Sequence, residues 1–247
     1  MHHYTTHQKI VFVSDVHLRD QFDPNVARLS ECLNRLADKV DAIYILGDLF
    51  DFWISAGCVH THSKILSSLR DITRRCPIYF MPGNRDFFMT PALCRRFGMK
   101  KIPDPYTIQH GDKRILLTHG DLLCTSDRSY QLMRRILQNS LIKGLHAIIP
   151  SRIITFLTRK IQSACRQSKR RKPPQRMQAD DATVRTWFQR YQPDVLIYGH
   201  VHVPNHYCLF DTGACGEVIV LDTWDNQANY CLVAETSPML VSDSSVT

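Results

Sequence analysis

Residues 9–17 have the sequence KIVFVSDVH, in which an apolar, β-branched run leads directly into an aspartate and a histidine two positions apart. The same arrangement recurs four times: an apolar run followed at once by polar side chains that can bind metal ions. The runs are 42–46, 78–81, 115–117 and 195–198, and they lead into G-D-L-F-D, G-N-R-D, H-G-D and G-H-V-H. Short runs of this kind predict strands. We therefore expect five strand ends to converge on one edge of the fold.

Strand-like and helix-like segments alternate along most of the chain, which predicts the α/β class. Its 247 residues, 44% of them hydrophobic, are enough for one such domain. Apolar spacing predicts helices near 25–38, 62–74, 90–97 and 181–191. Strands are expected at 9–13, 42–46, 78–81, 106–109, 114–118, 195–198, 205–209, 218–222 and 230–235.

The segment 128–177 departs from this alternation and from the charge balance of the rest of the chain. Between Asp127 and Asp180 there are thirteen lysines and arginines and no acidic residue, although the whole chain has a net charge of only +8. Isoleucines and leucines lie among these basic residues. We expect a basic, amphipathic helical lid at 128–177, facing an anion, inserted between core segments 1–127 and 178–236. Residues 237–247 are expected to form a flexible tail.

Several protein classes are disfavoured by composition. The uncharged apolar stretches are shorter than the roughly 18 residues that a membrane span requires, and the first fifteen residues lack the apolar core of a signal peptide. Nine scattered cysteines without a C-x-x-C pair argue against a disulfide framework and against a zinc knuckle. We expect a soluble, cytosolic protein with reduced cysteines.

The polar residues at the five expected strand ends are suited to a two-metal site. An Asp and a His two positions apart can reach one ion, and an Asp from the next strand can bridge two ions about 3.5–4 Å apart. Oxygen and imidazole ligands together favour Mn²⁺ or Fe²⁺ and allow Zn²⁺ or Mg²⁺. Two such ions turn water into a hydroxide that can attack phosphorus. The candidate ligands are Asp15, His17, Asp48, Asn84, His119, His200 and His202.

Each motif alone has a simpler interpretation. G-D-x-x-D is more often a turn, and G-H-x-H more often a pair of structural histidines, than a metal site. Five such motifs in this order, each directly after an expected strand, argue strongly against the simpler interpretation.

In this order the motifs D-x-H, G-D, G-N, H-G and G-H-x-H resemble the signature of calcineurin-like metallophosphoesterases over nearly the whole chain. The resemblance implies a four-layer α/β/β/α sandwich. It also implies one metal held by Asp15, His17, Asp48 and His202, and a second held by Asp48, Asn84, His119 and His200. Asp48 would bridge the two ions.

A narrower resemblance is to the UDP-2,3-diacylglucosamine diphosphatase family of lipid A synthesis. G-D-L-F-D-F-W, G-N-R-D-F, H-G-D-L-L-C-T-S-D-R-S-Y-Q and L-D-T-W-D-N-Q carry it. Arg85 stands where the wider family has a histidine; a guanidinium cannot donate a proton but can clamp phosphate oxygens. The resemblance implies substrate contacts from Asn84, Arg85, Asp127 and His200.

Two parts of the chain depart from the narrower pattern. In the lid, this chain has Cys165, Arg166, Lys169 and Lys172 at the aligned substrate-contacting positions, and Lys172 matches best. Lys169 is kept as a further candidate contact. The usual G-H-T-H-R-P is G-H-V-H-V-P here, so Val203 replaces an arginine. These changes affect the acyl-sugar contacts and leave the metal ligands intact.

We predict a Mn²⁺-dependent hydrolase that cleaves a UDP-linked acylated sugar to UMP and a sugar 1-phosphate. Its amphipathic lid would bind peripherally to the cytoplasmic face of the inner membrane. One alternative is a related phosphoesterase acting on another nucleotide, a phosphodiester or nucleic acid. Nucleic acid is disfavoured because few aromatic residues lie among the basic ones. A second alternative is a non-enzymatic membrane-binding module.

Overall fold

In the computed structural model the chain is described for residues 3–4, 9–55, 57–126, 131–132, 134–135, 178–211, 214–234 and 237–243. The helices are α1 (Pro24–Ala37), α2 (Cys58–Thr61), α3 (Ser63–Ile72), α4 (Pro91–Arg96) and α8 (Asp181–Tyr191). The strands are β1 (His3–Tyr4), β2 (Lys9–Val13), β3 (Ala42–Leu46), β4 (Ile78–Met81), β5 (Lys100–Lys101), β6 (Tyr106–His110), β7 (Lys113–Leu117), β8 (Val195–Tyr198), β9 (Asn205–Asp211), β10 (Ala214–Val220), β11 (Ala228–Ala234) and β12 (Ser237–Asp243).

One sheet has the strand order β12-β11-β2-β3-β4-β5 and is covered on its outer face by α1 and α3. Helix α1 begins cleanly because Asp23 caps it, accepting a hydrogen bond from the Asn25 amide, and because Pro24 occupies the first turn. Its buried residues recur at helical spacing and pack with the outward-facing residues of β2 and β3. Each such side chain contributes roughly 1.5–3 kcal/mol when fully buried.

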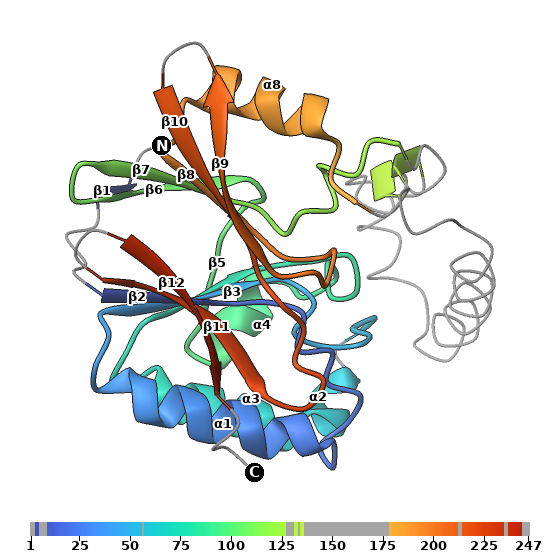
Figure 1. The fold of residues 1–247 in the computed structure, drawn as a ribbon. Coiled ribbons are helices and arrows are strands. Elements are labelled where there is room, and N and C mark those ends of the chain that lie inside the picture. Colours follow the sequence, from blue (N-terminus) through green and yellow to red (C-terminus); the bar gives the residue numbers. More distant parts are fainter. Residues whose placement is uncertain are drawn as a thin grey trace.

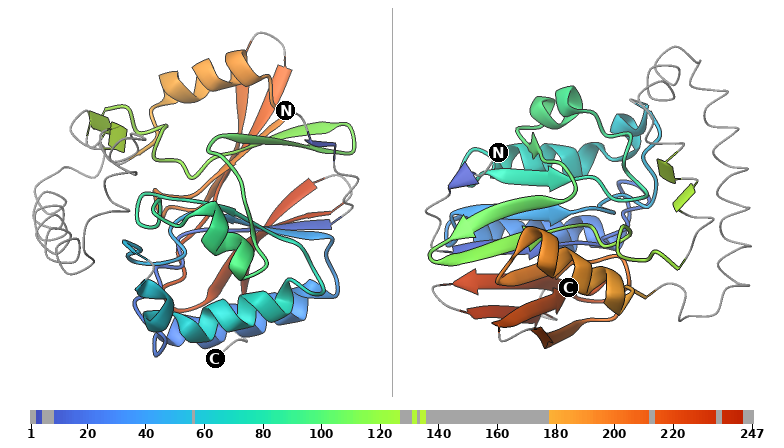
Figure 2. Two further views of the ribbon diagram at one scale, coloured as in Figure 1. Left: turned by 180° about the vertical axis from the view of Figure 1, so that it is seen from behind. Right: turned by 90° about the horizontal axis from the view of Figure 1, so that it is seen from above.

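The second sheet has the order β1-β6-β7-β8-β10-β9, and α8 packs on its outer face. Val184 of α8 is buried against Leu116, Leu196 and Val218. The two sheets face each other across an apolar layer to which both contribute. Ile10 and Phe12 of β2 lie on one side of this layer, and buried residues of β7 and β8 lie on the other. Figure 1 shows the resulting sequence of layers, α1 and α3, two sheets, then α8, and the left view of Figure 2 shows it from behind. This is the expected α/β/β/α sandwich.

The central strands β2, β3, β4 and β8 are buried along nearly their whole length, which explains their nearly uninterrupted apolar sequences. Along β2, Val11 and Val13 pack toward the helices, whereas Ile10 and Phe12 pack between the sheets. Strands β2, β3 and β4 are mutually parallel, as are β7 and β8. Their carboxyl ends therefore lie together at one edge of each sheet, where the candidate metal-binding motifs begin.

The expectation of a flexible tail at 237–247 is wrong for residues 237–243. These residues form β12 and pair antiparallel with β11, with Leu240 opposite Cys231. Leu240 packs against the layer between the sheets, and Pro238 is tolerated because β12 is an edge strand. The expected lid lies outside the described residues except at 131–132 and 134–135. Within the described part of the chain, no helix is long and apolar enough to cross a membrane.

Candidate metal centre

The loops that follow the converging strands are tied to one another by their backbones. The amide of Asp15 donates to the Gly47 carbonyl at 3.2 Å, and the amide of His17 donates to the Asp48 carbonyl at 3.0 Å. In the other sheet, the Gly199 amide after β8 donates to the His119 carbonyl after β7 at 3.0 Å. The positions of the candidate ligands are therefore fixed by main-chain contacts as well as by their own side chains.

Asp15, His17 and His202 form a first group whose ligand atoms lie within 4.8 Å of one another. The Nε2 atoms of the two histidines are 3.2 Å apart, and each lies near Asp15 Oδ1, at 3.6 Å from His17 and 3.2 Å from His202. The other oxygen of Asp15 accepts a 2.8 Å hydrogen bond from the His200 amide. One carboxylate oxygen of Asp15 is thus held by the protein and the other faces two imidazole nitrogens.

Asp48, His119 and His200 form a second group, whose ligand atoms also lie within 4.8 Å of one another. His119 Nε2 lies 3.2 Å from His200 Nδ1 and 3.0 Å from Asn84 Oδ1. The opposite nitrogen of His119, Nδ1, lies 2.9 Å from the buried Leu46 carbonyl, which can only accept a hydrogen bond. If Nδ1 carries the proton, Nε2 points a lone pair at the Asn84 oxygen, a contact that a cation between them would stabilise.

Asp48 lies between the two groups. Its Oδ2 is 3.9 Å from His17 Nε2, whereas its Oδ1 is 3.6 Å from His119 Nε2. Oδ1 also accepts a 2.8 Å hydrogen bond from the Arg85 amide. The two oxygens of this carboxylate therefore face different ligand groups, which is the arrangement that a bridging ligand requires.

The electrostatics of the site favour positive charge. Burial raises the pKa of Asp48 and acts in the same direction on Asp15, but the neighbouring His17 and His202 imidazoles hold the pKa of Asp15 well below its usual range. Burial lowers the pKa of His119, but the Asp48 and Asp15 carboxylates outweigh this effect and raise that pKa to about 9. Two buried carboxylates thus attract cations in this pocket.

The backbone is strained at these positions. Asp15, His17, Asp48, His200 and His202 have φ angles of 54°, 54°, 51°, 70° and 56°, in the left-handed region that residues other than glycine rarely adopt. Among the described non-glycine residues the only other one is Gln192, which ends α8. Such strain costs on the order of 1 kcal/mol or more for each residue and is concentrated at functional sites. Five of the seven candidate ligands therefore adopt a conformation that favours function over stability.

Close packing around Asp48 and His119 requires glycine at position 83. A Cβ atom there would overlap Asp48 Oδ1 and would lie 2.5 Å from the Asp48 nitrogen and 2.9 Å from His119 Cε1. The G-N motif thus brings its backbone directly against two candidate ligands, one from each sheet. This explains why a glycine precedes Asn84 in the sequence.

Arg85 points its charged side chain toward the same edge. Its side chain is 26% exposed, and Nη1 lies 3.4 Å from Asp51 Oδ1. Asp51 belongs to neither ligand group. The guanidinium is therefore held beside Asn84 and Asp48 with donors remaining for a phosphate.

Asp86 is a supporting residue that sequence reasoning missed. It is fully buried, and its Oδ2 accepts hydrogen bonds from the Leu49 amide at 2.9 Å and the Phe50 amide at 3.4 Å, while its Oδ1 accepts one from the Gly83 amide at 2.7 Å. Burial, followed by the nearby Asp48 charge, raises its pKa to about 7. Asp86 joins the loop of Asp48 to the loop of Asn84, and its place in G-N-R-D was the available signal.

Arg134 alters the interpretation of the basic segment. Its Nε lies 2.6 Å from Asp121 Oδ2 and its Nη2 lies 3.5 Å from Asp104 Oδ2, and both carboxylates are nearly inaccessible. This arginine, one of the thirteen counted as facing an anion, is instead paired inside the protein next to His119 and Gly120. Asp127, Lys169 and Lys172, the expected substrate contacts, lie outside the described residues.

The donor set fits two divalent ions. Each group combines one carboxylate with two imidazoles, and Asn84 adds an amide oxygen to the second. The buried Asp15 Oδ1 has no hydrogen-bond partner among the described residues, although it faces two histidines. Oxygen and imidazole donors of this kind suit Mn²⁺, Fe²⁺ or Zn²⁺.

Comparison with known proteins gives a consistent result. A family model described as "Calcineurin-like phosphoesterase" matches residues 8–204. UDP-2,3-diacylglucosamine hydrolase of Vibrio cholerae is 34% identical over 223 residues, covering 89% of this chain and 92% of the relative. The enzyme of the same name from Aeromonas hydrophila is 33% identical over 221 residues, and that from Pseudomonas fluorescens is 34% identical over 221 residues. The Aeromonas match covers 89% of this chain and 92% of the relative, and the Pseudomonas match covers 88% of each.

Among solved structures, an archaeal phosphodiesterase superposes with a TM-score of 0.50 at 13% sequence identity, covering 95% of this chain and 99% of the other. At that identity the similarity concerns the fold alone. It agrees with the two-sheet architecture described above.

Proposed function

The chain belongs to the calcineurin-like phosphoesterase family, and from this premise we propose that it hydrolyses the pyrophosphate bond of UDP-2,3-diacylglucosamine, releasing UMP and 2,3-diacylglucosamine 1-phosphate. The observation that carries the proposal is the position of Asp48, with its two oxygens facing two separate ligand groups. Three relatives named for this substrate are similar to the chain over most of both sequences. They narrow the proposed substrate from phosphoesters in general to the UDP-linked sugar.

In this proposal Asp15, His17, Asp48 and His202 hold one divalent ion, and Asp48, Asn84, His119 and His200 hold the other. We propose Mn²⁺ as the ion, with Fe²⁺, Zn²⁺ or Mg²⁺ as substitutes. When bound, such ions supply Lewis-acid activation of water and of phosphate oxygens. The Leu46 carbonyl fixes the ring of His119, and the His200 amide fixes the carboxylate of Asp15. The protein thus supplies pre-oriented ligands rather than a nucleophilic side chain.

Arg85 has a separate role in this proposal. Its guanidinium is suited to stabilising negative charge on the phosphates rather than to transferring protons. The Arg85 amide also holds Asp48 Oδ1 at 2.8 Å. Asn84, Arg85 and His200 would contact the phosphates, and Asp127, Lys169 and Lys172 would contact the sugar.

The basic segment 128–177 supports a location at the cytoplasmic face of the inner membrane. Basic residues interleaved with isoleucines and leucines suit a surface that carries anionic lipids, where the acylated substrate resides. We propose that the protein binds there peripherally. Vesicles with and without anionic lipid, sedimented with the protein at low and high salt, test this: salt-sensitive binding to anionic vesicles is expected, and equal binding to neutral ones contradicts it.

The catalytic proposal is tested by offering the Mn²⁺-loaded protein UDP-2,3-diacylglucosamine and bis(p-nitrophenyl) phosphate in parallel. Higher kcat/KM for the UDP-linked substrate, with UMP as product, is expected. Asp48→Asn and His119→Gln should lower turnover to background while circular dichroism remains that of the folded protein. Asp112→Asn, at an exposed position in the β6–β7 turn, is the matched control and should retain activity.

The results separate the rival functions. Preference for the generic diester would refute the UDP-sugar assignment and favour a broader phosphodiesterase. Salt-sensitive binding of single-stranded nucleic acid would favour a nucleic-acid substrate. Vesicle binding without turnover of any phosphodiester would favour a non-enzymatic membrane module, and retained activity in Asp48→Asn would refute the ligand assignment.

A further inference from the structure

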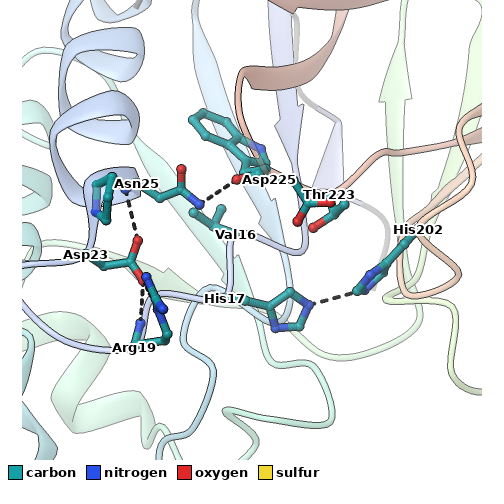
Figure 3. Close-up of a pocket in the computed structure, with 10 residues that line it drawn as sticks. Val16, His17, Arg19, Asp23, Asn25, His202, Thr223 and Asp225 are labelled. Atoms are coloured by element: carbon teal, nitrogen blue, oxygen red, sulfur yellow. Dashed lines mark hydrogen bonds and ion pairs between the residues drawn. The ribbon is translucent and has the colours of Figure 1, made fainter. Parts of the chain in front are cut away.

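A cavity of about 270 Å³ opens beside the first ligand group. His17 and His202 form one side, Arg19 and Asn25 another, and Thr223 and Asp225 a third. In Figure 3, Asn25 lies at the left and His202 at the right, with Asp225 and Thr223 between these two residues and His17 below. The cavity is therefore continuous with the proposed metal centre but extends away from it, toward the start of α1.

The cavity explains a motif to which the catalytic chemistry gives no role. L-D-T-W-D-N-Q, at 221–227, forms the loop between β10 and β11. Thr223 donates a 3.1 Å hydrogen bond from Oγ1 to the Asp15 carbonyl, which fixes this loop against the first ligand group. Trp224 is buried to 1% exposure in the cavity wall and anchors the loop in the core. The loop thus presents Asp225 beside the metal site on a rigid support.

The walls are polar and carry both signs of charge. The Arg19 Nε atom contacts Asp23 Oδ2 at 2.7 Å, and the Arg19 side chain is 68% exposed. Among the described residues, no hydrogen bond or ion pair is given for its two terminal nitrogens, although Asp20 and Asp51 lie within electrostatic range. Asp225 is exposed and forms no hydrogen bond or ion pair within the described part of the chain. A cation that can donate and a carboxylate that can accept suit a neutral polar ligand with carbonyls and hydroxyls. They do not suit an acyl chain.

The size and direction of the cavity identify the part of the substrate. Its volume is just below the roughly 300–1,000 Å³ of pockets for drug-sized ligands, which suits a nucleoside and is small for two acyl chains. Arg85 and Asn84 lie beside the second ligand group, none of whose residues lines the cavity. A pyrophosphate spanning both groups would direct one of its two substituents toward His17 and His202, and the small polar cavity suits the nucleoside better than the diacylated sugar.

We propose that this cavity is the subsite for the nucleoside end of the substrate, an inference that rests on the proposed function. Asp225 accepts hydrogen bonds from the ribose hydroxyls, and Arg19 donates to a carbonyl oxygen of the uracil ring. The first ligand group then lies next to the UMP-side phosphate, and the second next to the sugar phosphate.

Direct binding tests the subsite without turnover. Calorimetric titration of the Mn²⁺-loaded protein with UMP and with inorganic phosphate separates nucleoside contacts from phosphate contacts. Asp225→Ala and Arg19→Gln should each weaken UMP binding about tenfold while phosphate binding is unchanged. Asn226→Ala, next to Asp225 and exposed but outside the cavity, is the matched control and should bind UMP as the unaltered protein does.

Kinetics give a second readout. In Asp225→Ala, the ratio of kcat/KM for UDP-2,3-diacylglucosamine to that for bis(p-nitrophenyl) phosphate should fall about tenfold, through a higher KM for the nucleotide substrate. An unchanged ratio with unchanged UMP binding, or equal weakening of UMP and phosphate, overturns the subsite. Failure of the unaltered protein to hydrolyse the UDP-sugar overturns the proposed function instead, and the UMP titrations then still decide the subsite.

Discussion

His17 and His202 place their Nε2 atoms 3.2 Å apart, although they follow strands of two different sheets. His17 follows β2 in the sheet covered by α1, and His202 follows β8 in the sheet covered by α8. The Asp48 and His119 pair also joins the two sheets, with 3.6 Å between Oδ1 and Nε2. Ions bound at these positions would therefore connect the two halves of the sandwich as well as serve the chemistry.

We predict that metal removal lowers thermal stability as well as activity. A ligand present at a hundred times its Kd stabilises the folded state by about 2.7 kcal/mol, which corresponds to roughly 5–10 °C in Tm for a domain of this size. Differential scanning fluorimetry with and without chelator measures the change. His202→Gln, which removes one connection between the sheets, should show a smaller drop on chelation; an equal drop would contradict this role.

Gly83→Ala should impair metal binding more than folding. The new methyl group would overlap the Asp48 carboxylate and press against His119 Cε1, so one of these side chains must move. We expect Mn²⁺ affinity to fall by about tenfold or more, measured by calorimetry, with a corresponding loss of turnover. Gly57→Ala is the control, since its added Cβ meets only Ser55 Oγ at 3.3 Å. Unchanged affinity in Gly83→Ala would show that the ligands tolerate displacement.

Asp86→Asn should destabilise the protein and weaken the metal site together. The carboxylate accepts three amide hydrogen bonds, whereas the Asn side chain would direct its NH₂ group at one or more of those donors. Leaving a buried donor unsatisfied costs about 1–3 kcal/mol, and loss of a group supporting metal ligands typically costs about 10–100-fold in metal affinity. Urea unfolding and Mn²⁺ titration test the two effects. A stability loss with unchanged affinity would mean that Asp86 supports folding alone.

The convergence of the five motifs was predictable because each motif directly follows an apolar run of a largely buried strand, and parallel strands place such ends at one edge. Strands β2, β3, β4 and β8 have the expected bounds, and the layer order was correct. Register and spatial neighbours were not predictable in this way. The role of Asp86 depends on amides from a loop 36 and 37 positions earlier in the chain as well as on the nearby Gly83 amide.

The remaining differences also arise from contacts between distant segments. The strand β12 was missed because Pro238 and polar residues obscure its alternation, and because its pairing with β11 determines its conformation. The basic composition of 128–177 predicted a segment that faces an anion, but Arg134 in that segment is paired with Asp104 and Asp121. Composition shows that charge is present, and only the folded structure shows which charges are already neutralised.

His62 should make stability depend on pH in a way that a single substitution can isolate. It lies at the start of α3, buried to 2% exposure against Phe50 and Trp53, with ring centroids 4.5 and 5.8 Å away. Burial lowers its pKa from 6.5 to about 4, although Asp20 and Asp23 favour the charged form. Below pH 6.5 the unfolded chain binds a proton here that the folded chain does not bind.

The contribution of His62 to stability is therefore complete above about pH 6.5 and is lost as pH falls toward about 4. At 1.36 kcal/mol per pKa unit, the loss is on the order of 2–3 kcal/mol. Urea unfolding of the chelated protein between pH 7 and pH 4.5 should show a shallower pH dependence for His62→Gln than for the unaltered chain. His60→Gln, at an exposed position two residues away, should keep the original dependence. Parallel curves for His62→Gln and the unaltered protein would mean that His62 accepts a proton in the folded state as readily as in the unfolded one.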